Sequence, residues 1–173
     1  MAKPSRLTVA NWAVVRSVSK ILGPDMRFAF VNSNAGLRRK AANLNAFSYR
    51  WVSGILQATV LAALTSPGFE SLLQRASATY LERRQNFLKI LVDAGFKAGG
   101  TEGLNVWIPV EDEQFMTRRL LEAHWLVRPG SIFRIDAPEG IRVTTSTMTE
   151  QTARSFVDTL AILRDEIRVD HGA

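Results

Sequence analysis

Near the start of the chain, short apolar runs are separated by turn residues. Residues 12–18 and 26–32 are rich in Val, Phe and Ala, and a Gly-Pro-Asp turn signal at residues 23–25 separates them. Short runs of this kind, interrupted by turn residues, favour strands. The pattern therefore predicts two neighbouring strands joined by a turn.

The spacing then changes to that of helices. Residues 35–66 have a helical pattern that breaks into two pieces, and residues 69–94 carry apolar side chains about one helical turn apart. Gly95 supplies the usual stop for the longer helix. We therefore expect three helices after the strand pair.

The second half of the chain alternates between strand-like and helix-like patterns. The sequence predicts a strand at 104–110, a helix at about 112–124 and another strand at 141–145. Residues 125–135, WLVRPGSIFRI, have the pattern of a strand, a Pro-Gly turn and a second strand. We assign no chemistry to that turn. Trp107 and Trp125 are expected in the core of this part.

A final helix ends the pattern. Thr147 and Glu150 have the spacing of a capping box. One apolar face follows helical spacing along this helix, formed by Phe156, Val157, Leu160, Leu163 and Ile167. The second half is thus predicted to be a small two-layer β-α-β-β-α unit.

Composition limits the class of protein. The 173 residues are 46% hydrophobic, which suits one domain or slightly more, and the absence of cysteine excludes disulfides and thiolate metal sites. Two distant histidines make a metal cluster unfavourable. The longest apolar stretch, residues 51–64, is too short and too polar to cross a bilayer. With no signal-peptide pattern at the N-terminus, we expect a soluble cytoplasmic protein.

Charge is distributed unevenly. Residues 1–100 contain 14 Lys and Arg against 4 Asp and Glu, whereas residues 101–173 contain 8 against 12. A basic half is compatible with nucleic-acid binding, but the basic residues are scattered and no recognition motif accompanies them. Solvated helix faces are the favoured explanation. A further alternative is that an acidic part of the protein, complementary to this basic half, is missing from the chain.

Four polar residues surround the predicted strand turn. Lys20 offers an amine, which desolvation at the end of a buried strand would activate as a nucleophile. Ser17 and Ser19 offer hydroxyl donors, and Arg27 offers a permanently charged, bidentate donor. Such a set suits a phosphate group and a covalent bond to the amine. The alternative is an ordinary set of surface side chains at a strand end.

The pattern Ser-x-Ser-Lys-x-x-x-Pro-x-x-Arg, residues 17–27, resembles the pyridoxal-phosphate lysine motif of fold-type I aminotransferases. The downstream segments GGTEGLNVWIPV, WLVRPGSIF and GIRVTT look like that family's later elements in the same order. The resemblance implies an α/β fold, the C-terminal part of a pyridoxal-phosphate (PLP)-dependent transferase (aminotransferase class I/II). Residues 1–66 would be a remnant of the large cofactor domain, 67–95 the connecting helix and 96–173 the small α+β domain.

The resemblance also implies residue roles. Lys20 would be the internal aldimine lysine for pyridoxal 5'-phosphate, and Ser17, Ser19 and Arg27 would bind its phosphate. Arg142, in GIRV, would match the arginine that binds a substrate α-carboxylate. A plain surface arginine on a strand is the alternative for that position.

Some of the family's features have no counterpart in this sequence. The acid that keeps the pyridine nitrogen protonated lies upstream of the lysine in the family, but here no Asp or Glu precedes Asp25. The upstream phosphate cup and the ring-stacking aromatic residue are absent as well. We therefore expect a C-terminal fragment that does not catalyse transamination alone.

Two functional classes remain open. One is a truncated class I/II aminotransferase that moves amino groups between amino and keto acids. The other is a MocR-type regulator of the GntR family, in which an N-terminal winged helix binds DNA and an aminotransferase-like domain senses an amino-acid or vitamin B6 ligand. The segment RSVSKILGPDMRFAFV looks closer in sequence to the regulators than to the enzymes. We expect the parent protein to be a homodimer. A non-catalytic remnant is the third option.

Overall fold

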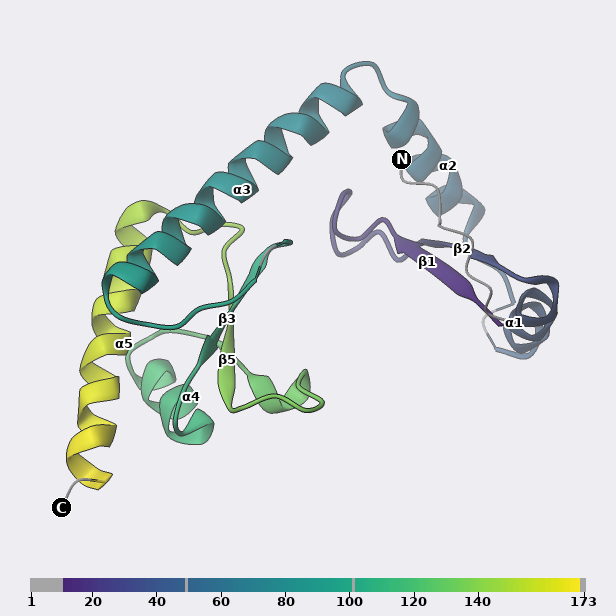
Figure 1. Ribbon diagram of the computed structural model, residues 1–173. Coiled ribbons are helices and arrows are strands. Elements are labelled where there is room, and N and C mark those ends of the chain that lie inside the picture. The colour runs from purple at the N-terminus through teal and green to yellow at the C-terminus, as the bar shows by residue number, and fades with distance from the viewer. Residues whose placement is uncertain (1–10, 49, 101, 172–173) are drawn as a thin grey trace. The chain divides into compact units, whose positions relative to one another are not determined.

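The computed structural model describes residues 11–48, 50–100 and 102–171 (Figure 1). The chain divides into two compact units, Met1–Leu73 and Gln74–Ala173, and each is considered by itself. None of the described helices combines the length and the apolar character that a bilayer crossing requires.

The first unit begins with a two-stranded antiparallel sheet. Strand β1 (Ala13–Ser17) pairs with β2 (Ala29–Ser33), which confirms the two predicted strands. The second strand nevertheless begins later than residue 26, where the apolar pattern placed it. The amide of Met26 donates to the carbonyl of Gly23, and the amide of Phe28 donates to that of Met26. The amides of Met26 and Phe28 are thus used within the turn region, and β2 begins at Ala29.

Two helices complete the first unit, as the broken helical pattern predicted. Helix α1 spans Ala35–Phe47 and α2 spans Gly54–Thr65. The side chains of Asn34 and Ser53 accept hydrogen bonds from amides in the first turns of these helices. Such caps satisfy backbone donors that have no partner inside a helix, so they fix where each helix starts.

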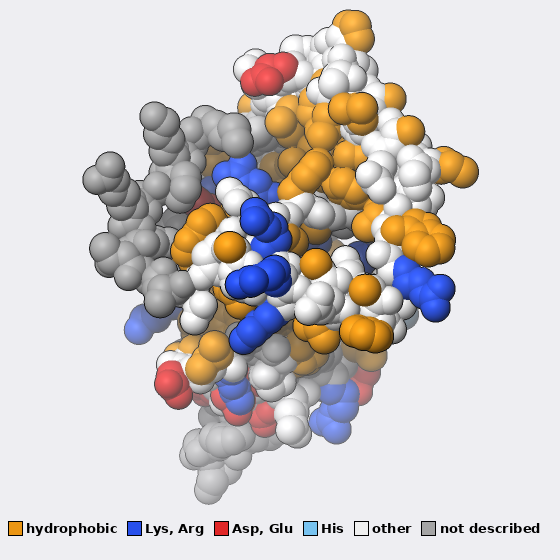
Figure 2. Space-filling model, turned by 90° about the vertical axis from the view of Figure 1, so that its right-hand side faces the viewer, with side chains coloured by type: hydrophobic (Ala, Val, Ile, Leu, Met, Phe, Trp, Pro, Cys, Tyr) orange, Lys and Arg blue, Asp and Glu red, His pale blue; other side chains and the backbone are white. Residues whose placement is uncertain are grey.

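Most apolar side chains of the first unit are open to solvent. Among its described hydrophobic residues, Val18 and Val60 are the two that are buried. Figure 2 shows many hydrophobic side chains open on the face that it presents. The large exposed ones are Val15, Ile21, Phe30, Val31, Leu44, Phe47, Trp51, Val52, Ile55, Leu61, Leu72 and Leu73.

Helix α3 (Phe69–Asp93) confirms the predicted long helix. Its end is set by Gly95, whose φ of 78° is a left-handed conformation that glycine adopts without strain. The amide of Gly95 donates to the carbonyl of Val92, and the amide of Phe96 to that of Leu91. The boundary between the two units falls inside this helix.

The second unit is a sheet covered on one face by helices. Strands β3 (Asn105–Pro109), β5 (Gly140–Thr144) and β4 (Arg128–Pro129) pair antiparallel in the order β3-β5-β4. Helices α4 (Glu113–Glu122) and α5 (Glu150–His171) pack on the sheet together with the later part of α3. The predicted β-α-β-β-α order is confirmed. The central core residues are Phe87, Leu91, Val106, Ile108, Met116, Leu120, Ile141, Phe156, Val157 and Leu160.

The segment WLVRPGSIFRI does not form the predicted pair of strands. After the short β4, the chain turns into a 3-10 helix, η1 (Gly130–Ile132), because the amides of Phe133 and Arg134 both donate to the carbonyl of Gly130. Ile132 and its apolar neighbours are exposed, so no buried face favours a second strand there.

The start of α5 also differs from the sequence pattern. Thr149, and not Thr147, caps the helix, because its hydroxyl accepts from the amide of Thr152 at 3.1 Å. Met148 is buried and its amide donates to the carbonyl of Thr145, which holds the chain in a turn before the helix starts. The predicted apolar face of the helix is confirmed, since all five of its residues are buried.

The two tryptophans of this unit lie on different faces of the sheet. Trp125 packs on the core, with its ring centroid 5.3 Å from that of Phe156, as predicted. Trp107 is outside the core, and that prediction was wrong. Its ring covers Gly130 and Gly140 so closely that a Cβ at either glycine would overlap the indole.

Candidate cofactor and ligand sites

The hairpin between β1 and β2 brings the four polar residues of the sequence motif to one turn. Pairing continues past Ser17, because the amide of Val18 donates to the carbonyl of Phe28 at 3.1 Å. The carbonyl of Val18 then accepts from the amide of Leu22, which curls the chain at Lys20. Arg27 returns on the opposite side of the hairpin. The spacing of the motif thus follows from the hairpin itself.

The two serine hydroxyls are held in a local network. The amide of Ser19 donates to Oγ of Ser17 at 3.2 Å, and that hydroxyl donates to Oγ of Ser19 at 3.1 Å. The hydroxyl of Ser19 donates in turn to the carbonyl of Met26 at 3.0 Å. The serines therefore tie the two arms of the turn together, and Ser19 must rotate to donate to a bound anion.

Lys20 is exposed, and so are four of the five residues of β1. The expectation that this lysine ends a buried strand is therefore wrong for the described chain. The cause is that the apolar side chains of β1 and β2 find few partners within the first unit, as Val15 and Val31 show by being more than half exposed. Burial in this unit does not desolvate the amine.

Arg27 is exposed as well. Within the residues that the structure describes, the ion pairs do not include it. One turn thus presents a guanidinium, an amine and two hydroxyls. This donor set fits a phosphate group beside an aldehyde, because guanidinium and hydroxyl groups hold phosphate oxygens and a lysine amine reacts with carbonyl carbon.

Arg142 lies in the second unit, on the face of the sheet that the helices leave uncovered. Its partner on β3 is Trp107 and its partner on β4 is Arg128. The guanidinium carbon stands 3.8 Å from the ring centroid of Phe133, a close cation–π contact. The Nε atom of Arg142 is buried and has no hydrogen-bond partner among the described residues.

Glu113 is an organising residue that sequence reasoning missed. Only 3% of it is exposed, and its carboxylate accepts from the amide of Ser131 at 2.9 Å and from Gly140 at 3.4 Å. The guanidinium of Arg134 adds an ion pair at 3.2 Å. An acidic residue at the start of a helix is common, so the sequence held no signal for this long-range role.

The carboxylate of Glu113 is held in its charged form. Burial alone would raise its pKa, but the hydrogen bonds from Ser131 and Gly140 and the charge of Arg134 together lower the pKa below its usual value of 4.5. Glu113 therefore fixes the loop after β4, and with it the position of Phe133 beneath Arg142.

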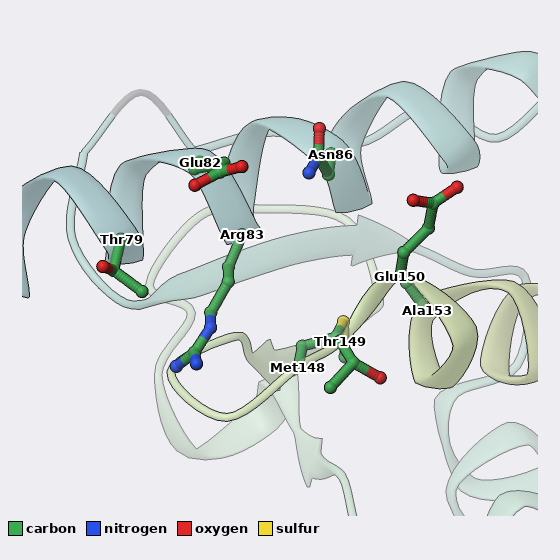
Figure 3. Close-up of a pocket in the computed structure, with 8 residues that line it drawn as sticks. All are labelled: Thr79, Glu82, Arg83, Asn86, Met148, Thr149, Glu150 and Ala153. Atoms are coloured by element: carbon green, nitrogen blue, oxygen red, sulfur yellow. The ribbon is translucent and has the colours of Figure 1, made fainter.

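A separate pocket of about 350 Å³ lies in the second unit, between α3 and the start of α5 (Figure 3). Arg83 extends from α3 across it and donates to the carbonyl of Ser146. Glu150 at its edge pairs with Arg154 at 2.7 Å. The charged groups of the pocket thus already interact in part with other groups of the protein, and no sequence motif points to the pocket.

Comparison with known proteins identifies relatives that match most of this chain. The family model of aminotransferase class I and II matches residues 2–160. The vitamin B6 salvage pathway transcriptional repressor PtsJ of Salmonella typhimurium is 39% identical over 157 residues, covering 89% of this chain and 35% of the repressor. The HTH-type transcriptional regulator TauR of Rhodobacter capsulatus is 29% identical over 125 residues, covering 69% of this chain and 26% of the regulator. The chain thus spans about a third or less of these relatives.

Solved structures share the fold at lower identity. The alpha-aminoadipate aminotransferase LysN of Thermus thermophilus has a TM-score of 0.76 at 20% identity, covering 91% of this chain and 42% of LysN. The kynurenine aminotransferase of Pyrococcus horikoshii has a TM-score of 0.77 at 20% identity, covering 88% of this chain and 40% of that enzyme. The α/β fold predicted from the sequence is confirmed, and the chain belongs to the aminotransferase class I and II family.

Proposed function

We propose that this chain is the effector-sensing, aminotransferase-like part of a MocR-type transcription regulator of the GntR family. The observation that carries the proposal is the similarity to a repressor named for vitamin B6 salvage, 39% identical over most of this chain. TauR, also a transcriptional regulator, supports the same class. The likeness to aminotransferases, at about 20% identity, supports the fold alone.

The proposed cofactor is pyridoxal 5'-phosphate, and the hairpin residues fit it. Arg27 would hold phosphate oxygens through a bidentate, charge-assisted contact, and Ser17 and Ser19 would add hydroxyl donors. Lys20 would attach covalently through Nζ, since a neutral amine condenses with the aldehyde carbon and water leaves. When bound, the cofactor supplies an electron-withdrawing ring and an aldehyde that reacts with amines.

Arg142 is proposed to bind the carboxylate of an amino-acid ligand. Its side chain is held against the ring of Phe133, and its guanidinium can donate to carboxylate oxygens. In a regulator such binding changes which conformation is favoured, because a ligand shifts a population by its difference in affinity for two states. DNA contact would come from a winged-helix domain outside this chain, in a homodimeric parent protein.

The central test is to map the lysine that reacts. Pyridoxal phosphate is added to the protein, the bond is reduced with borohydride, and peptides are identified by mass spectrometry. We expect the reduced adduct on the peptide that contains Lys20, and we expect its loss in Lys20→Ala but not in Lys40→Ala. An adduct confined to other lysines, such as Lys89, would remove the assignment.

An amino-transfer assay separates a regulator from a truncated class I/II aminotransferase, which is the alternative function. The same protein is supplied with pyridoxal phosphate, an amino acid and a keto acid. We expect no turnover. Turnover that depends on Lys20 would favour the enzyme and contradict the regulator.

A further inference from the structure

Arg128 and Arg142 are direct neighbours across two strands. Strands β4 and β5 pair antiparallel, with Arg128 opposite Arg142. Residues paired in this way point to the same face of a sheet, with Cβ atoms roughly 5 Å apart. The neighbouring residues Val127, Ile141 and Val143 are buried in the core, which places both arginines on the uncovered face.

Two like charges opposite each other destabilise a sheet unless something offsets them. The ion pairs formed among the described residues involve neither Arg128 nor Arg142. Two nearby acids, Glu113 at the start of α4 and Glu139 in the loop before β5, both pair with Arg134. Asp136, the other acid of that loop, is in none of the ion pairs among the described residues. The uncovered face therefore carries two positive charges without a protein counter-ion in the described part of the chain.

The surroundings hold one of these charges firmly. Arg142 rests on the ring of Phe133, and the amide of Phe133 donates to the carbonyl of Gly130 at 2.7 Å. The Trp107 indole covers Gly130 and Gly140 beside it. A guanidinium that is stacked in this way loses less freedom on binding, so it is a better anion ligand than a mobile one. Arg128, in contrast, is exposed and free to approach a bound anion.

We propose that Arg128 and Arg142 together bind a small anion that carries two negative charges. The proposal rests on the proposed role of Arg142 as a carboxylate ligand and extends it to the class of effector. Two ligand chemistries have the required charge: a compound with two carboxylates, and a phosphate group. Arg142 takes the first charge, and Arg128 selects against ligands that carry a single one.

The test is a titration of the 173-residue protein, followed by NMR or calorimetry, with glutarate, butyrate and inorganic phosphate as probes. We expect glutarate to bind about tenfold more tightly than butyrate, because a second charged contact is available. Arg128→Gln should bring this ratio close to one, and Arg142→Gln should weaken both carboxylates. Arg118→Gln, which removes an exposed arginine of α4, is the matched control and should change neither affinity. Circular dichroism verifies that each variant is folded.

The outcomes separate the possible interpretations of the site. Phosphate binding as tight as glutarate binding, and dependent on both arginines, supports a phosphate effector; weaker phosphate binding supports a dicarboxylate. A glutarate preference that survives in Arg128→Gln, or falls equally in Arg118→Gln, overturns the proposal and leaves the role of Arg142 standing. If no probe binds, the proposal is overturned too, while the mapping of Lys20 decides the cofactor assignment independently.

Discussion

Single residues decide how the uncovered face of the small sheet is built. The Trp107 ring lies against two glycines, and the space between ring and backbone is too small for a side chain. A built Cβ at Gly140 would stand 2.6 Å from the indole, closer than such atoms approach in proteins. The glycines at positions 130 and 140 are thus explained by packing against tryptophan, since neither has a positive φ.

Replacing Gly140 by alanine should destabilise the second unit by about 1–3 kcal/mol, the usual cost of overpacking. Urea unfolding followed by circular dichroism measures the change. Gly54→Ala is the control, because a Cβ there meets nothing within 4 Å and alanine favours the helix. Adding Trp107→Leu to Gly140→Ala should recover part of the loss; no recovery would mean that the clash is not the cause.

Glu113 should make the stability of the second unit depend on pH. Its pKa is lowered in the folded state, so its stabilisation is fully present above 4.5 and is lost as pH falls through the lower folded pKa. We expect Glu113→Gln to reduce the free energy of unfolding by about 2 kcal/mol at neutral pH, and by much less at a pH of about 3.

The control for this prediction is Glu150→Gln, which removes an exposed ion pair with Arg154 and should change stability little at either pH. Unfolding curves of both variants and the parent chain at the neutral and the acidic pH provide the comparison. An equal loss for Glu113→Gln at the two pH values would show that its charge is not what stabilises the loop after β4.

At the level of elements, helices were predictable and short strands were less so. The five apolar positions predicted for α5 follow helical spacing, and every one is buried. β4 has two residues, and its continuation is decided by Glu113, which accepts from the amide of Ser131 from a distant helix. Local sequence carries no record of such a partner, so the extra strand after Gly130 was wrongly predicted.

The candidate site was likewise predictable from the sequence only in part. The spacing from Ser17 to Arg27 was sufficient to place four polar side chains on one hairpin, because a hairpin turn is a local structure. The exposure of Lys20 and the hydrogen bond from Ser19 to the carbonyl of Met26 could not be foreseen. Burial depends on what packs over a strand, and hydroxyl partners depend on side-chain torsions that spacing does not determine.

Helices α1 and α2 should promote self-association of the chain. Phe47 is 93% exposed and Ile55 is 82% exposed, on helices with little buried surface. Exposed apolar surface of this kind favours contact with another molecule. We expect sedimentation to show a concentration-dependent mass, and the double variant Phe47→Ser, Ile55→Ser to raise the dissociation constant about tenfold or more.

Leu126→Ser is the matched control for self-association, because this leucine is 85% exposed but lies in the second unit. It should leave the mass distribution unchanged. An effect equal to that of the double variant would place the contact elsewhere, and a monomer at all concentrations would show that the exposed helices do not associate.

At the scale of the whole molecule, the two compact units share one continuous helix. The boundary after Leu73 falls near the start of α3, whose 25 residues would extend about 37 Å at about 1.5 Å per residue. Continuous backbone hydrogen bonds run through this boundary, in contrast to the exposed, irregular linkers that usually separate domains. The units are therefore distinct in packing and uninterrupted in secondary structure.

This continuity determines where a protease can separate the units. Trypsin needs an extended backbone, so Arg75, inside α3, should resist cleavage although it lies next to the boundary. Arg50 is exposed and lies outside any helix, so it should be cut more readily than Arg75. Limited digestion should then yield a stable fragment that begins at Trp51 and retains α2 and all of α3; early cleavage after Arg75 would mean that the helix opens at the boundary.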